Sequence, residues 1–215
     1  MLFLDLSAAF DTIDHDILID ILKTKFGISG QVLKWFKSYL FSRQYRVQIG
    51  SALSDVICFL FGVPQGSILG PILFILYISE LNIIVRQFGL KIHCFADDAQ
   101  LYIAFKAIDI VPTIEVIESC LETVKVWMTK MFLRLNEDKT QLVVISPTKS
   151  LVKSNMNSAI VFGENRIKCS STAENLGVVF DDSMSFTKQI SRTVSSGYNS
   201  LNAIPPFINS YTIKQ

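Results

Sequence analysis

Two adjacent acids, Asp97 and Asp98, stand between two strand-like, mostly apolar runs at residues 91–94 and 101–105. Charged side chains among apolar neighbours cost solvation free energy unless a positive group lies beside them. A hairpin turn would present both carboxylates at its tip, where a divalent cation is their natural partner because hard cations prefer carboxylate oxygens. An Asp-Asp pair in a turn is also commonly just solvated. The rest of the chain has to decide between a metal site and an ordinary turn.

The hydrophobic pattern predicts an α+β fold. The chain has 215 residues, half of them hydrophobic and 16 of them Phe, enough to bury the core of one domain or of one domain plus a fragment. Alternation and short apolar runs predict strands at 2–6, 45–49 and 56–61, a hairpin at 91–105, a strand at 142–145, a hairpin at 159–169 and a strand at 176–180. Helical spacing predicts helices at 14–26, 31–42, 67–88, 113–135 and 186–204. This mixture indicates an antiparallel sheet with helices packed on one face.

Residues 56–79 contain no charged side chain and are long enough to span a bilayer. The segments 64–67 and 70–71 carry Pro and Gly and interrupt this stretch near its middle, which leaves apolar runs too short to span. We therefore expect a buried strand, a turn and a buried helix here, and no membrane partner.

The cysteines indicate a reducing, intracellular location without separating nucleus from cytoplasm. They form no Cys-x-x-Cys pair and lie far apart, at Cys58, Cys94, Cys120 and Cys169. This spacing suggests neither a zinc site nor a disulfide framework. A signal peptide is not expected either, because no basic region followed by a long apolar run opens the chain.

Charge is uneven along the chain, although the net charge of +1 gives no global argument for a nucleic-acid partner. Residues 21–54 contain no acid and six bases, namely Lys23, Lys25, Lys34, Lys37, Arg43 and Arg46. An acidic start followed by a basic segment is compatible with a metal site beside a phosphate-binding face. Solvated faces of ordinary helices explain the same pattern equally well.

Asp5 is a single acid within the apolar run at residues 2–6, where a lone charge calls for a partner. If this strand neighbours the 91–105 hairpin in one sheet, Asp5, Asp97 and Asp98 meet at one edge. Carboxylates that close repel one another and demand cations. Two divalent ions about 3.5–4 Å apart are a known solution for in-line phosphoryl transfer. The three acids therefore point to the chemistry of a polymerase or a nuclease.

Five segments, in order, resemble the motifs of reverse transcriptases from non-LTR (LINE-like) retrotransposons. Residues 3–15, FLDLSAAFDTIDH, are similar to motif A, and residues 62–71, GVPQGSILGP, to motif B. Residues 95–98, FADD, resemble a variant of the Tyr-x-Asp-Asp motif C. Residues 135–140, LNEDKT, and 175–178, NLGV, resemble motifs D and E. The resemblance implies a polymerase palm that uses an RNA template, a DNA primer and deoxynucleoside triphosphates.

The resemblance also implies roles for the acids and for one lysine. Asp5 and Asp97 would hold two Mg²⁺ ions, with Mn²⁺ as an alternative, and Asp98 would support the same metal site. Lys139 would be the proton donor to pyrophosphate, although a solvated loop lysine is an equal alternative. Trp35 and Trp127 are expected to have packing roles.

Further roles concern the substrates. Phe10 would lie under the incoming sugar and reject a 2′-hydroxyl by steric exclusion, its alternative being an ordinary core Phe. Gln65 and Gly66 would lie against the nucleotide and template, where glycine permits close backbone approach. Leu176 and Gly177 would form part of the primer grip.

The resemblance covers little beyond the palm, which we place at residues 1–182, with residues 183–215 as an incomplete start of the thumb or connection. The fingers that precede motif A in reverse transcriptases are expected to be missing. Because catalysis by positioning needs both substrates held, this chain alone is predicted to have little or no polymerase activity.

Three other interpretations stay open. A catalytically silent retroelement remnant would act at most as a nucleic-acid or protein binding module. A group II intron maturase or a viral RNA polymerase is a different palm enzyme, and residues 7–11 with a bulky Phe10 argue against it. An integral membrane protein, which would rest on residues 56–79, is the weakest alternative.

Overall fold

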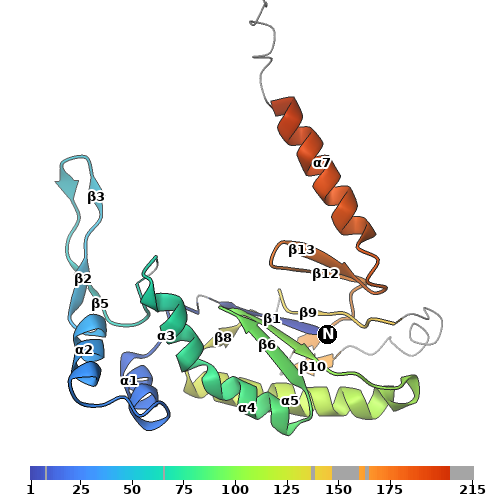
Figure 1. The fold of residues 1–215 in the computed structure, drawn as a ribbon, viewed down its shortest axis with the longest axis horizontal. Coiled ribbons are helices and arrows are strands. Elements are labelled where there is room, and N and C mark those ends of the chain that lie inside the picture. Colours follow the sequence, from blue (N-terminus) through green and yellow to red (C-terminus); the bar gives the residue numbers. More distant parts are fainter. Residues whose placement is uncertain (8, 65, 137–138, 147–159, 163–164, 204–215) are drawn as a thin grey trace, which may run out of the picture.

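The computed structural model of the chain describes residues 1–7, 9–64, 66–136, 139–146, 160–162 and 165–203. Its centre is a five-stranded antiparallel sheet in the order β6 (Lys91–Phe95), β7 (Asp98–Tyr102), β1 (Leu2–Ser7) and β8 (Arg134–Leu135). The fifth strand, β9 (Gln141–Leu142), also pairs with β1. Strand β1 is therefore central, and both β6–β7 and the segment after residue 133 are placed relative to it (Figure 1).

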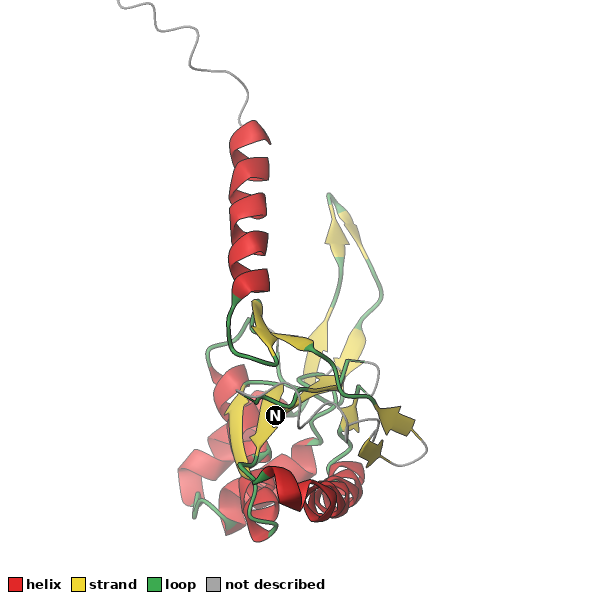
Figure 2. Cartoon of the chain, turned by 90° about the vertical axis from the view of Figure 1, so that its right-hand side faces the viewer, coloured by secondary structure: helices red, strands yellow, loops and turns green. Residues whose placement is uncertain are grey.

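Apart from the last helix, which projects from the body, the helices gather on one side of this sheet, as Figure 2 shows. Side chains alternate between the two faces of a strand, and Leu2, Leu4 and Leu6 of β1 are buried in the main core. The helix α5 (Ile110–Lys130) packs below them with a buried stripe that includes Leu121 and Val124. The mixed helical and antiparallel architecture confirms the α+β prediction.

The segment predicted as one helix at 67–88 forms two, α3 (Leu69–Tyr77) and α4 (Ser79–Gln87), which join at Ile78. The break lets the halves face different partners, because α3 packs against α1 (His15–Thr24) while α4 packs against α5 and β6. The stretch Leu69–Gln87 is long and apolar enough to cross a membrane, a test that core helices also pass. Its Phe74, Leu81 and Val85 side chains belong to the protein core.

After α1, helix α2 (Gly30–Leu40) leads into a long two-stranded arm that projects from the body (Figure 1). Its base pairs β2 (Arg43–Tyr45) with β5 (Ile57–Phe59), and its tip pairs β3 (Gln48–Ile49) with β4 (Ala52–Leu53). The alternation at 45–49 predicted a strand with one buried face, and residues 56–61 were predicted to form a buried strand. Both predictions of burial were wrong, because the arm is exposed on both faces and Ile49 is 78% exposed. Apolar and polar residues do alternate here, but no second layer from the described part of the chain covers the apolar side.

The helix predicted for residues 113–135 extends further toward the C-terminus than the helix in the structure. In the structure α5 spans Ile110–Lys130, and Phe132 has a φ of 52°, a left-handed conformation that stops the helix. Leu135 therefore does not continue the helical stripe but pairs with Leu6 in the sheet. A short 3-10 turn, η1 (Ala107–Asp109), precedes α5.

The C-terminal part begins with the hairpin of β10 (Ile160–Phe162) and β11 (Asn165–Ile167). A second hairpin, β12 (Thr172–Asn175) and β13 (Val178–Asp181), follows and lies on the sheet face opposite α5 (Figure 2). Residues 172–175 were not predicted as a strand, and Leu176 and Gly177 form the turn instead of the strand start. Helix α7 (Thr187–Ala203) then leaves the body.

The two tryptophans differ in environment. Trp127 is buried, in keeping with a packing role, and its Nε1 donates to Glu80 Oε2 at 2.9 Å. Trp35 is half exposed on α2, where it packs against the rings of Phe36 and Tyr39. All four cysteines, which fall within the described residues, are free thiols.

Candidate active site

The predicted acids gather where β1 meets the β6–β7 hairpin. Asp5 is the direct cross-strand partner of Asp98 in the antiparallel β1–β7 register. Phe95 pairs with Asp98, so Ala96 and Asp97 form the two-residue turn of the hairpin. Ala96 has a φ of 53°, a strained left-handed conformation for a residue with a Cβ. The topology thus places all three carboxylates in one corner of the sheet, with Asp5 and Asp98 face to face.

The electrostatics of this corner reflect that crowding. Burial raises the pKa of the Asp98 carboxyl above its ordinary value, the charges of Asp97 and Asp5 raise it further, and Lys139 lowers it. The Nζ of Lys139 lies 3.7 Å from Asp5 Oδ2, and its side chain is 69% exposed. One mobile, solvated ammonium offsets only part of the repulsion among three acids. The site therefore favours additional positive charge.

Hydrogen bonds of the described residues at the two ends of the predicted motif D accompany the approach of Lys139 to this site. The backbone N–H of Asn136 donates to Asp5 O at 2.8 Å. The backbone N–H and the Oγ1 of Thr140 both donate to Asn136 O, at 3.0 and 2.8 Å. Asn136 and Thr140 had no predicted role, because a backbone contact between distant segments leaves no trace in residue pattern.

The donor set suits a hard divalent cation. Mg²⁺ is usually held by one or two carboxylates together with substrate phosphates, and the Asp5–Asp98 pair offers two. A cavity of about 210 Å³ adjoins the pair and is lined by Asp5, Asp98, Lys139, Gln141, Glu174, Asn175 and the neighbouring Phe3 and Leu4. Among the described residues no group of three or more His, Cys, Asp or Glu is preassembled around one point as a metal cage. Carboxylates on an open cavity match an ion shared with a substrate.

Phe10 lies just beyond β1, half-buried, with its ring centroid 4.8 Å from that of Phe74 in α3. The predicted motif B loop is tied to the same segment, because Val63 N–H donates to Phe10 O at 2.9 Å. Gly62 has a φ of 84°, and a Cβ there would lie 2.7 Å from Phe10 O, so only glycine fits. The motif A and motif B segments are thereby locked together.

His15 joins these segments a second time and was not predicted to matter. Its buried Nε2 lies 2.7 Å from Gly62 O, within hydrogen-bonding distance. Gly66 is exposed, with a φ of 77° and open space where a Cβ would be. Gln65 lies outside the described residues.

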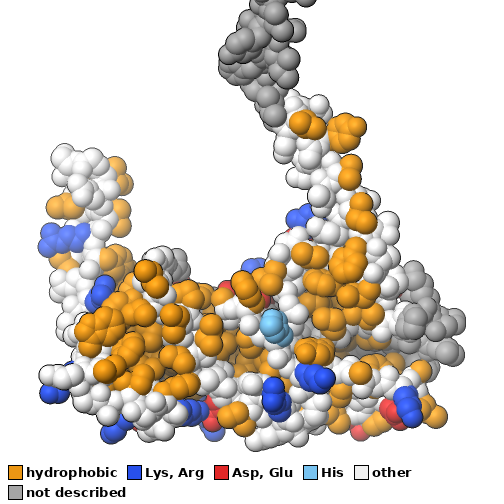
Figure 3. Space-filling model, in the orientation of Figure 1, with side chains coloured by type: hydrophobic (Ala, Val, Ile, Leu, Met, Phe, Trp, Pro, Cys, Tyr) orange, Lys and Arg blue, Asp and Glu red, His pale blue; other side chains and the backbone are white. Residues whose placement is uncertain are grey.

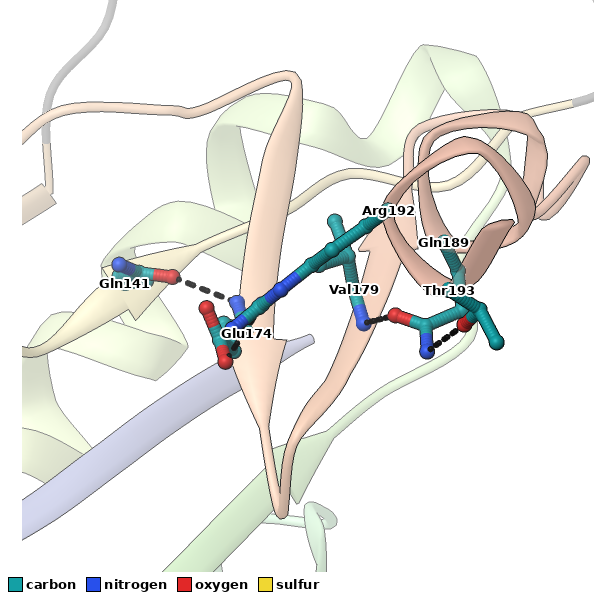
Figure 4. Close-up of polar contacts among 6 residues, drawn as sticks. All are labelled: Gln141, Glu174, Val179, Gln189, Arg192 and Thr193. Carbon is teal, nitrogen blue, oxygen red and sulfur yellow. Dashed lines mark hydrogen bonds and ion pairs between the residues drawn. The ribbon is translucent and has the colours of Figure 1, made fainter. Parts of the chain in front are cut away.

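The β12–β13 hairpin, which carries the predicted motif E, is attached to the site by polar contacts (Figure 4). Glu174 N–H donates to Gln141 Oε1 at 3.2 Å, and Arg192 of α7 forms an ion pair with Glu174 at 2.7 Å. On the other strand Val179 N–H donates to Gln189 Oε1 at 2.8 Å. The hairpin is thus held between the sheet and α7.

The tip of this hairpin is hydrogen-bonded to β7, the strand that carries Asp98. Asn175, the last residue of β12, accepts a hydrogen bond from the Nε2 of Gln100 in β7. Leu176 and Gly177 follow in left-handed conformations, with φ of 50° and 76°. Leu176 is 50% exposed, so the tip presents an apolar side chain to solvent.

A larger cavity of about 810 Å³ begins near the end of β1, and it is lined by Ser7, Asp11, Thr12, Phe61, Thr129, Phe132, Leu133 and Arg134. Ser7 lies two residues after Asp5, so both belong to the same face of the strand. This volume is in the usual range for small-molecule sites. Ser7 thus connects the strand that carries Asp5 to this cavity, which none of the three acids of the site lines.

Comparison with known proteins agrees with this geometry. The profile of the family described as Reverse transcriptase (RNA-dependent DNA polymerase) matches residues 1–180. The RNA-directed DNA polymerase from mobile element jockey of Drosophila funebris is 27% identical over 194 residues, 87% of this chain and 20% of that protein. The probable RNA-directed DNA polymerase from transposon X-element of Drosophila melanogaster is 28% identical over 191 residues, 88% of this chain and 20% of that protein.

A third relative, the probable RNA-directed DNA polymerase from transposon BS of Drosophila melanogaster, is 26% identical over 213 residues. That match covers 96% of this chain and 23% of the relative, so the chain spans about a fifth of the length of these curated proteins. The family match, in contrast, covers most of the chain and includes all three acids. On this evidence the chain belongs to the reverse transcriptase family.

Proposed function

We propose that this chain forms the palm of an RNA-directed DNA polymerase from a non-LTR retrotransposon, with residues 1–182 as the palm and residues 183–215 as the start of the thumb or connection. The observation that carries the proposal is the facing pair Asp5–Asp98 with Asp97 in the adjoining turn, within a family match over residues 1–180. The substrates would be an RNA template, a DNA primer and deoxynucleoside triphosphates.

The chemistry would join the primer 3′-oxygen to the α-phosphorus of the nucleotide and release pyrophosphate. Asp5, Asp97 and Asp98 would hold two Mg²⁺ ions, or Mn²⁺ in their place. When bound, such ions neutralise charge on the attacking and leaving oxygens. Lys139, whose Nζ lies 3.7 Å from Asp5 Oδ2, would give a proton to the departing pyrophosphate.

Substrate positioning would fall to three other parts of the chain. Phe10, fixed against Phe74, would exclude a 2′-hydroxyl from the sugar site. Gln65 and Gly66 would contact the nucleotide and template. Leu176 and Gly177, at the hairpin tip held by Asn175, would guide the primer end toward the carboxylates.

The test is a chimaera in which residues 1–180 replace the matching segment of the jockey polymerase of Drosophila funebris. We expect Mg²⁺-dependent primer extension on an RNA template that Asp97→Asn abolishes, and little or no extension by the chain alone. A chimaera that folds yet stays inactive, beside an active parent, would support a catalytically silent remnant. Robust, Asp97-dependent extension by the chain alone would show that it needs no further parts.

A further inference from the structure

We infer that α2 and the base of the arm form a second nucleic-acid surface, away from the carboxylates, that binds a single strand. Bases would stack on Trp35, and phosphates would meet Lys34, Lys37, Arg43 and Arg46. This inference depends on the proposed function in one respect only, the choice of nucleic acid as the class of partner. The surface itself is argued from its own contacts and charges.

An aromatic and cationic ladder begins on α2 with Trp35 and Tyr39, four residues apart, and ends at Arg43, the first residue of β2. The rings of Trp35 and Tyr39 are stacked, with centroids 5.6 Å apart and planes 14° from parallel. The guanidinium of Arg43 lies 4.6 Å from the centroid of the Tyr39 ring, and its Nε donates to Tyr39 O at 2.6 Å. The ladder is therefore preorganised, with a charged group at one end and Trp35 at the other.

Trp35 is the free end of the ladder, and 52% of its surface is exposed. An indole held by Tyr39 on one side and by the edge of Phe36, 5.2 Å between centroids, has little freedom to collapse into the core. Base stacking on an exposed, immobilised aromatic ring is the common way in which proteins bind single strands without sequence preference. Trp35 is thus suited to receive a base.

The charge around the ladder is almost entirely positive. Lys34 and Lys37 are exposed on α2, one residue before and two residues after Trp35 in the sequence, and Arg43 and Arg46 lie at the base of the arm. None of these four takes part in the three ion pairs formed within the described chain, whereas Lys25 is paired with Glu80. Figure 3 shows basic side chains on the arm and no acidic one on that part of the visible face.

The charge balance favours a polyanion over another protein surface. From Ile21 to Phe59 the chain contains six bases and a single acid, Asp55. Four unpaired cations would have to be desolvated against a protein partner, whereas phosphates neutralise them and release bound counterions. Val32 on α2 and Tyr45 in β2 are also exposed and would serve the same strand as sugar and base contacts.

The first test measures binding of fluorescein-labelled 20-mer oligouridylate to the whole chain by fluorescence anisotropy across salt concentrations. For single strands the slope of log K against log salt is about −0.7 for each phosphate neutralised. The double variant Lys34→Ala/Lys37→Ala is therefore expected to reduce the slope by about 1.4. The control, Lys91→Ala/Lys106→Ala, removes the same charge from β6 and from the start of η1 and should leave slope and affinity close to wild type.

The second test asks for stacking. Trp35→Ala should weaken oligouridylate binding by roughly five- to a hundredfold, and Trp35→Phe should recover part of it because a ring face remains. Binding should quench tryptophan fluorescence in the wild type and not in Trp35→Phe, since the remaining indole, Trp127, is buried. Thermal melts of each variant report whether it is folded.

Unchanged affinity and salt slope in both folded variants would overturn the inference. It would also be overturned by a chain that ignores oligouridylate but self-associates in sedimentation, with the association lost in Trp35→Ala, because the patch would then be a protein interface. An inactive jockey chimaera with intact, Trp35-dependent binding would count against the proposed polymerase function alone. An active chimaera with Trp35-independent binding would count against this surface alone.

Discussion

Asp5 and Asp98 face each other directly across β1 and β7, so two carboxylates occupy one cross-strand pair of the central sheet. Like charges placed opposite each other in this way destabilise a sheet. Lys139 relieves only part of the repulsion because it is largely exposed and, within the described residues, forms an ion pair with Asp5 and not with Asp98. The sheet therefore gives up stability at the place where the proposed chemistry needs charge.

Replacing one of these acids should make the metal-free chain more stable. We expect Asp98→Asn to raise the free energy of unfolding by about 0.2–1 kcal/mol, the cost typical of a like-charge cross-strand pair. Urea unfolding in the presence of EDTA measures this. The control is Asp20→Asn, an exposed acid on α1, which should change stability little. A loss of stability in Asp98→Asn would show that its carboxylate is favourably paired.

Magnesium should stabilise the wild type by the same logic. At a free Mg²⁺ concentration of about ten times its Kd, binding to the folded chain alone is worth about 1.4 kcal/mol. Thermal melts with and without Mg²⁺ should therefore differ for the wild type and not for Asp5→Asn. An equal rise in both proteins would indicate ion binding elsewhere.

Replacing Leu176 should change stability and function in opposite directions. Its φ of 50° is unfavourable for a Leu, and asparagine is preferred before glycine in such two-residue turns. We expect Leu176→Asn to raise stability by about 0.5–1 kcal/mol. If the tip guides the primer, the same change should lower primer use in the jockey chimaera, measured as KM for primer. Stabilisation without any effect on primer use would leave the tip a plain turn.

Phe10 should control the choice of sugar in the same chimaera. Removing its ring in Phe10→Ala opens space beneath the sugar, so ribonucleotide incorporation should rise relative to deoxynucleotide incorporation. Because the ring also packs on Phe74, the variant should lose about 3 kcal/mol or less of stability. The conservative change Phe10→Tyr should keep discrimination. Equal selectivity in Phe10→Ala would make Phe10 an ordinary packing residue.

The sequence was most informative where local pattern and burial agree. The hairpin around Asp97 could be predicted because two strand-like runs flank a turn, and Asp5 could be joined to it because a charge inside an apolar strand needs a partner. That Asp5 pairs directly with Asp98 could be learned only from the structure, because alternation with period two does not specify which residues of two strands pair. Strand β12 escaped prediction because Glu174 and Asn175 are held by Gln141 and Gln100, polar contacts that produce no hydrophobic period.

Two other predictions differ from the structure because contacts between distant segments decide the outcome. The alternation at residues 45–49 is real, yet a strand is half-buried only if a second layer exists, and the arm has none in the described structure. By its spacing Leu135 fits the apolar stripe of α5. The left-handed conformation of Phe132 ends the helix before that residue, and Leu135 pairs with Leu6 in the sheet instead. Neither outcome could be read from the intervals between apolar residues.

Tyr77 is the last residue of α3 and connects three segments through one buried hydroxyl. It donates to Met131 O at 2.7 Å and accepts from Asp14 N–H at 3.3 Å. In Tyr77→Phe both backbone groups lose this partner, so we expect a loss of about 1–3 kcal/mol in urea unfolding. The matched control is Tyr102→Phe, where the side chain is exposed and the change should be close to neutral.

The same hydroxyl should make stability fall at high pH. Burial raises the pKa of Tyr77 to about 12 from the ordinary value of 10, so the folded state keeps this proton more tightly than the unfolded chain. The contribution is complete below about pH 10 and is lost as pH rises toward 12, by roughly 2–3 kcal/mol in all. Urea unfolding from pH 9 to 12 should show this extra decline in wild type and not in Tyr77→Phe. Parallel curves for the two proteins would mean that Tyr77 ionises as easily in the folded chain as in the unfolded one.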